Sequence, residues 1–167
     1  MRDKIIYIII GLAFVLQPFF SAMLPVWLVP DLDFCILTVI GLTMDPEDMV
    51  KPLGLLFGLA LVGDIYASQH IGVTVIAMAI VLIALLFFRR LANVENLLFA
   101  LLITTAASAI FELVHWGMYA LMSSPYSFVY MAMKFPQFAV PNVVVTTIAL
   151  FVSTRELIKK RRDKYFR

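Results

Sequence analysis

The chain has 167 residues, of which 63% are hydrophobic and only 14% are charged, and its mean hydropathy is +0.99. Because soluble domains carry about 25% charged residues, this composition excludes a soluble globular protein and predicts an integral protein of the cytoplasmic (inner) membrane. The formal net charge of +2 is uninformative, and the single cysteine, Cys35, excludes an intramolecular disulfide.

Six apolar segments predict an all-α bundle of about six transmembrane helices in one domain, residues 1–167. The second and third segments are short for straight crossings, so four full spans with a re-entrant hairpin between them are the alternative. Turn-forming residues separate the segments: Pro30-Asp31 precedes the second, and Asp45-Pro46 is expected to begin the third helix, with Asp45 as its N-cap. The approximate spans are 5–24, 33–44, 52–68, 71–89, 96–122 and 137–155.

The distribution of lysine and arginine predicts the orientation. With six crossings, 12 of the 13 basic residues fall on the side that holds both chain ends, and only Lys134 falls on the other. Cytoplasmic loops are enriched in Lys and Arg, so both termini are predicted to be cytoplasmic and the loop around Ser124–Lys134 to be external. The basic residues on the predicted cytoplasmic side are Arg2, Lys4, Lys51, Arg89, Arg90, Arg155, Lys159, Lys160, Arg161, Arg162, Lys164 and Arg167.

The third segment has two distinct faces. Gly54 and Gly58 form a GxxxG pair, which permits close approach of another helix. We expect this face to receive a transmembrane helix, either from a partner or from the chain's own first segment, and we favour the internal contact. Leu53, Phe57, Leu61 and Asp64 lie on a different face, expected to be used inside the fold.

Polar residues in the last two segments follow a helical spacing. Asp64, Glu112 and His115 are ionisable residues inside predicted spans, where each needs a polar partner, a water-filled cavity or a neutral form. Both polar faces are expected to point inward. Interhelical hydrogen bonds that fix the packing, a ligand pocket or proton path, and a partner-binding groove all remain open. The predicted stripes are Thr105, Ser108, Glu112, His115 and Tyr119 in the fifth segment, and Asn142, Thr146 and Ser153 in the sixth.

No catalytic constellation stands out in the sequence, which contains no HExxH, GxSxG or phosphate-binding glycine-rich loop. Glu112 and His115 resemble a carboxylate–histidine metal pair, but two ligands on one helix do not make a site, and only Asp64 could add a third. We therefore predict no enzyme, cofactor, metal site or nucleic-acid partner. The basic tail is expected to anchor the last helix on anionic lipid headgroups or to dock a cytoplasmic protein.

Short motifs in the first half of the chain resemble the rod shape-determining protein family MreD. They are Leu16-Gln17, Pro30-Asp31-Leu32, Gly54 to Gly58, Gly63-Asp64-Ile65 and Ile71-Gly72-Val73. The match in order and spacing covers about residues 10–75, and the remainder is similar only in hydropathy and in its basic tail.

The resemblance implies a non-enzymatic scaffold subunit of the bacterial cell-elongation machinery. Its expected partners are an MreC-like single-span protein, the RodA glycosyltransferase with a class B penicillin-binding protein, and the cytoplasmic MreB filament. The family is also thought to share its fold with the substrate-binding components of energy-coupling-factor transporters, so a vitamin-uptake component is the alternative. Those components couple through small residues four apart in the first helix, whereas Ala13 is followed here by Gln17.

Overall fold

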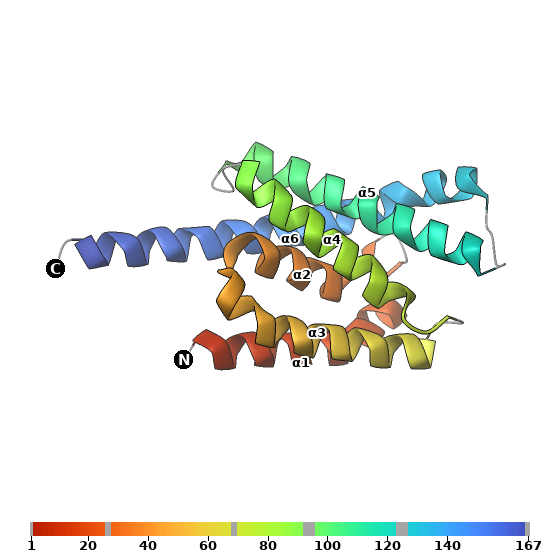
Figure 1. The fold of residues 1–167 in the computed structure, drawn as a ribbon, viewed down its shortest axis with the longest axis horizontal. Helices are drawn as coiled ribbons and strands as arrows, with labels where there is room; N and C mark the ends of the chain where they lie inside the picture. The colour runs from red at the N-terminus through yellow and green to blue at the C-terminus, as the bar shows by residue number, and fades with distance from the viewer. Residues whose placement is uncertain (1, 26–27, 68–69, 92–95, 123–126, 166–167) are drawn as a thin grey trace.

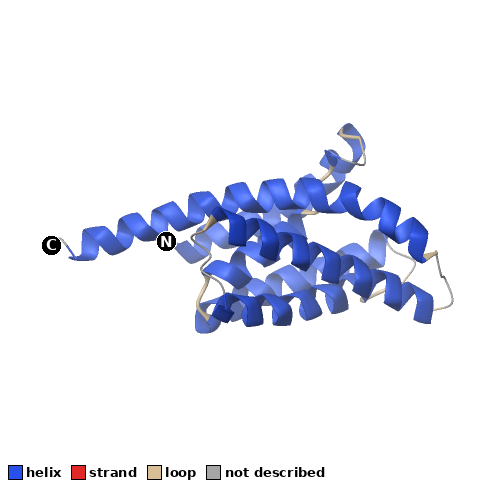
Figure 2. Cartoon of the chain, turned by 90° about the horizontal axis from the view of Figure 1, so that it is seen from above, coloured by secondary structure: helices blue, strands red, loops and turns tan. Residues whose placement is uncertain are grey.

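The computed structural model describes residues 2–25, 28–67, 70–91, 96–122 and 127–165, and this part of the chain is all-α (Figures 1 and 2). Successive helices run in opposite directions, so that the first helix begins, and the last helix ends, at the same end of the bundle (Figure 1). The described residues form six helices: α1 Arg2–Met23, α2 Leu32–Thr43, α3 Pro46–Ala67, α4 Val73–Leu91, α5 Leu97–Leu121 and α6 Phe128–Tyr165.

Helix lengths and apolar surfaces identify a membrane protein. Four stretches are long and apolar enough to cross a bilayer, whereas α2 and α4 are shorter apolar helices. Large apolar side chains remain exposed along the bundle, such as Phe19 at 60% and Ile83 at 69%. Lipid is the solvent that this surface requires. The four long stretches are Ile5–Met23, Pro46–Tyr66, Leu98–Leu121 and Phe128–Ser153.

The short helix α2 lies at the centre of the bundle. It contacts α1, α3, α4 and α6, and its Phe34 and Leu37 are fully buried. The Phe34 ring meets Phe111 of α5 edge-on at a centroid distance of 5.3 Å, and Phe111 stacks on Phe138 of α6, also at 5.3 Å. A helix of 12 residues is tolerated at this position because protein, rather than lipid, surrounds it.

The predicted start of the third helix is confirmed, whereas the predicted start of the sixth is wrong. The third helix begins at Pro46, so it is 22 residues long, although its apolar span was expected to be only residues 52–68. The sixth helix begins at Phe128 instead of about residue 137 and includes both Pro136 and Pro141. Lys134 therefore belongs to this helix and not to a loop, whereas Ser124 lies outside the described residues. Pro136 and Pro141 do not end the helix, since membrane helices tolerate proline where neighbouring groups satisfy the freed carbonyls.

Candidate functional site

Asp64 caps the N-terminus of α4. It lies near the end of α3 and is 5% exposed. Its Oδ2 atom accepts hydrogen bonds from the N–H groups of Gly72, at 2.9 Å, and of Thr74, at 3.1 Å. The intervening turn needs glycine because Gly72 has a φ of +89°. Asp64 thus satisfies N–H groups that a helix terminus leaves free, which answers its predicted need for a polar partner.

Gln17 holds the connection between α1 and α2. Its Nε2 donates to the carbonyl oxygen of Pro30, and its Oε1 accepts from the N–H of Leu32, both at 3.1 Å. Asp31 then acts as the N-cap of α2 by accepting from the N–H of Phe34 at 3.0 Å. Two pairs of the short sequence motifs are therefore joined in space by side-chain-to-backbone hydrogen bonds: Leu16-Gln17 with Pro30-Asp31-Leu32, and Gly63-Asp64 with Ile71-Gly72.

Asn142 of α6 completes this junction. It is fully buried, and its Oδ1 accepts from the N–H of Asp31 at 2.6 Å. The Cys35 thiol lies 3.6 Å from the same oxygen and 3.8 Å from the Asn142 carbonyl. Burial raises the pKa of the Asp31 carboxyl group, and the hydrogen bond from Phe34 opposes that rise. α1, α2 and α6 are thus joined by polar contacts that their apolar surfaces alone would not specify.

The predicted polar stripe of α5 is only partly correct. Ser108 is fully buried, but its hydroxyl donates to the Thr104 carbonyl at 2.9 Å within its own helix, not to Glu112. Thr105 is exposed, and the fully buried threonine is its neighbour Thr104. The inward prediction for α6 is confirmed for Asn142 and Thr146, which are both fully buried.

In the rest of the predicted α5 stripe, His115 makes aromatic contacts and Glu112 lines a small cavity. The His115 ring lies 4.5 Å from that of Phe111 and 6.3 Å from that of Tyr119. Glu112 lines a cavity of about 200 Å³ together with Lys134 and Tyr130. The Lys134 ammonium group lies 5.1 Å from the centre of the Tyr130 ring.

Five buried polar atoms have no hydrogen-bond partner among the described residues, and none of them belongs to a residue that lines the small cavity. Within that part of the chain, no group of three or more His, Cys, Asp and Glu side chains is arranged to hold a metal ion. The free atoms are Asp33 Oδ1, His115 Nε2, Asn142 Nδ2, Thr146 Oγ1 and Thr147 Oγ1.

The glycine face of α3 is open. Gly54 and Gly58 are exposed, and a Cβ atom built on either glycine would meet no atom within 4 Å. The favoured prediction, an internal contact of this face with α1, is therefore wrong; of the α3 glycines, it is Gly63 whose Cβ would lie 4.0 Å from Phe14 of α1. Leu53 is buried and Phe57 partly buried, but Leu61 of the predicted inner face is 40% exposed. The alternative, a helix from a partner, remains a prediction.

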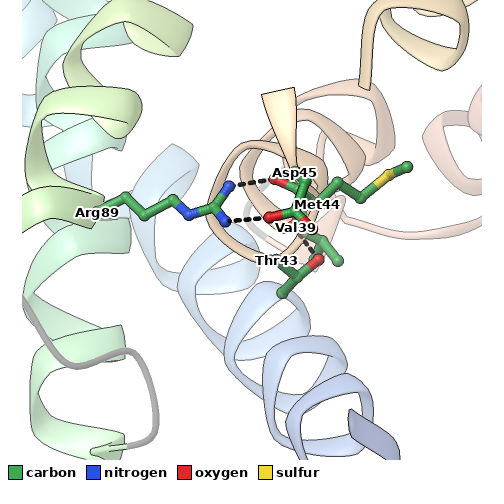
Figure 3. A network of polar contacts seen from close by, with 5 residues as sticks. All are labelled: Val39, Thr43, Met44, Asp45 and Arg89. Carbon is green, nitrogen blue, oxygen red and sulfur yellow. Dashed lines mark hydrogen bonds and ion pairs between the residues drawn. The ribbon is translucent and has the colours of Figure 1, made fainter. Parts of the chain in front are cut away.

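An ion pair and a capping contact join α4 to the α2–α3 connection, at the end of α4 opposite the Asp64 cap. Arg89 donates to the carbonyl oxygen of Met44 and, at 3.1 Å, to Oδ1 of Asp45 (Figure 3). The Asp45 side chain is 79% exposed, so this ion pair contributes little to stability. The Met44 carbonyl is one of the unpaired groups at a helix end. The hydrogen bond from Arg89 to this carbonyl therefore contributes more to stability than the exposed ion pair with Asp45.

The sequence predicted neither these Arg89 contacts nor an apolar groove that lies between α1 and α6, with α2 as its floor. Its volume is about 590 Å³, and its lining includes Ile9, Ala13, Ile36 and Ala149. No periodicity within one helix could reveal this groove, because three helices build it, and α6 is far from α1 and α2 in the sequence. The hydrogen bonds of Gln17 could have been predicted from the sequence, because a polar residue in an apolar span needs a partner.

Comparisons with known proteins add no identification. No protein family, no curated protein and no solved structure matches this chain.

Proposed function

We propose that the chain is a non-enzymatic scaffold subunit of the bacterial rod-shape machinery, similar to MreD. It would lie in the cytoplasmic membrane with both termini in the cytoplasm. The observation that carries the proposal is the pairing of the motifs: Gln17 bonds to both Pro30 and Leu32, and Asp64 bonds to Gly72. Motifs that resemble the family in sequence and are joined in space support a shared fold.

The exposed surface supports a role in binding within the membrane. The glycine face of α3 is open to a close-packed helix, which suits a single-span, MreC-like partner. The other proposed partners are RodA with its class B penicillin-binding protein and the MreB filament at the cytoplasmic side. Orientation rests on the basic residues, 12 of 13 of which fall on the side of the chain ends.

The alternative is a substrate-binding component of a vitamin transporter. Such a component needs an open small-residue face on the first helix, but Gln17 occupies that position and uses its amide to hold the α1–α2 connection. Ala13, the small residue four positions before Gln17, is only 6% exposed. Both observations favour the scaffold.

Mild detergent extraction from native membranes, followed by identification of the co-purifying proteins, tests the proposal. A single-span protein with an external coiled coil is the expected partner. Co-purification of an ATPase pair with a transmembrane coupling subunit would support the transporter and contradict the scaffold.

A further inference from the structure

The groove between α1 and α6 is open to the membrane along one side. Ile9 and Leu12 line it and are 48% and 53% exposed, so its α1 wall reaches the lipid-facing surface. Apart from Cys35, Thr43 and Ser153, the lining is entirely apolar. A molecule that fills this groove must therefore be apolar over most of its length.

The two ends of the groove differ. At the end away from the chain termini, the backbone N–H of Asp31 bonds to Asn142 and joins α2 to α6. Toward the chain ends, the lining reaches Ile5, Met44 and Ser153. The α6 wall covers residues 145–153, which at about 1.5 Å per residue is ~12 Å. That length is close to one leaflet of hydrocarbon, about 15 Å.

The size and shape of the groove suit an acyl chain. The groove has a volume of about 590 Å³ and extends along α1 and α2 as well as α6. A helix is about 10 Å across, whereas an extended hydrocarbon chain is much thinner and can lie between the α1 and α6 walls.

Basic residues lie next to both walls in the sequence, at the end of the groove near the chain termini. Arg2 and Lys4 directly precede Ile5 on α1, and Arg155 follows Ser153 by two residues on α6. Residues 155–167 contain seven basic residues, and both helices reach the same end of the bundle there (Figure 1). Charge at this end is therefore complementary to a negatively charged headgroup.

We propose that the groove binds an anionic phospholipid, with an acyl chain between α1 and α6 and the headgroup at the basic end. The assignment of this lipid to the cytoplasmic leaflet rests on the orientation in the proposed function, but the binding itself does not. The lipid fills a space that the chain's own helices leave open, and it would fix α1, which contacts only α2 and α3 substantially.

Lipid retention by the purified protein tests this proposal. The protein is exchanged into detergent with either phosphatidylglycerol or phosphatidylcholine of identical acyl chains, and bound lipid is counted by native mass spectrometry. We expect phosphatidylglycerol to be preferred at least about five-fold, the effect of one basic residue near an anionic headgroup. The preference should shrink in high salt, because salt screens exposed charges.

Groove-filling variants locate the bound lipid. Ala149→Phe, or Val145→Phe if the first does not fold, should reduce retention of phosphatidylglycerol by about ten-fold. Ala132→Phe is the matched control, since Ala132 lies on the same helix, is exposed and is not part of the groove; it should bind like the wild type.

Three results would overturn the proposal. The first is equal retention of both lipids, and the second is unchanged retention of phosphatidylglycerol in both groove variants. The third is that a groove variant loses a co-purifying protein but keeps its bound phosphatidylglycerol. Because purified protein suffices, the result is independent of whether an MreC-like partner exists.

Discussion

The cap formed by Asp64 provides the sharpest test of the fold. Replacing Asp64 with alanine leaves the N–H groups of Gly72 and Thr74 without their partner. Each unsatisfied donor costs ~1–3 kcal/mol. Both hydrogen bonds are only part-buried, so water relieves some of this cost, and we expect a total of about 3 kcal/mol. Asp64→Asn should cost only about 1 kcal/mol, because one oxygen accepts both bonds and the amide oxygen can replace it.

Thermal unfolding in mild detergent measures the difference. At ~2–4 °C per kcal/mol for a chain of this size, Asp64→Ala should lower the Tm by about 6–12 °C and Asp64→Asn by about 2–4 °C. Glu47→Ala is the control, since Glu47 is an exposed acid at the other end of α3, and exposed substitutions change stability by less than ~0.5 kcal/mol. The reasoning is refuted if the alanine variant melts like the control, or if asparagine is as damaging as alanine.

Three further predictions concern other parts of the bundle. Gln17→Ala should destabilise the protein by ~2 kcal/mol in the same assay, because the Pro30 carbonyl and the Leu32 N–H lose their partner; a wild-type Tm would contradict this. Replacing both Gly54 and Gly58 by leucine should leave a folded monomer by size-exclusion chromatography but reduce co-purification of the partner, since open space surrounds both glycines; undiminished binding would show that this face meets only lipid. Cysteines introduced at Ser127, which is exposed and directly precedes α6, and at Lys160 should be labelled from opposite sides of the membrane, the first from outside, and Cys35 gives little background because it is 4% exposed; labelling of both from one side would exclude six crossings.

Hydropathy and turn residues were sufficient to predict the helices, because each apolar run must satisfy its own backbone in lipid. Pro30-Asp31 and Asp45-Pro46 mark helix starts that the structure has at α2 and α3. The start of α6 could not be read in this way, since Pro136 and Pro141 lie inside the helix and are tolerated only because of neighbours that the sequence does not place.

The facing of individual side chains was less predictable than the helices themselves. Thr104 and Thr105 fit the spacing to Ser108 equally well, at four and three residues, and only the packing of α5 against its neighbours makes Thr104 the buried one. The glycine face of α3 was misassigned for the same reason, since a GxxxG pair permits close approach without stating whose helix approaches.

The residues that carry the family resemblance are occupied in closing the fold. Gln17 and Asp64 use their polar atoms on backbone groups of the following turns, so neither is available to recognise another molecule. Function must therefore reside on surfaces that these motifs position but do not form. Two such surfaces are the glycine face of α3 and the groove between α1 and α6, both open to the membrane. We therefore propose that the chain binds its partners within the bilayer, with a packed helix on the glycine face and a lipid in the groove.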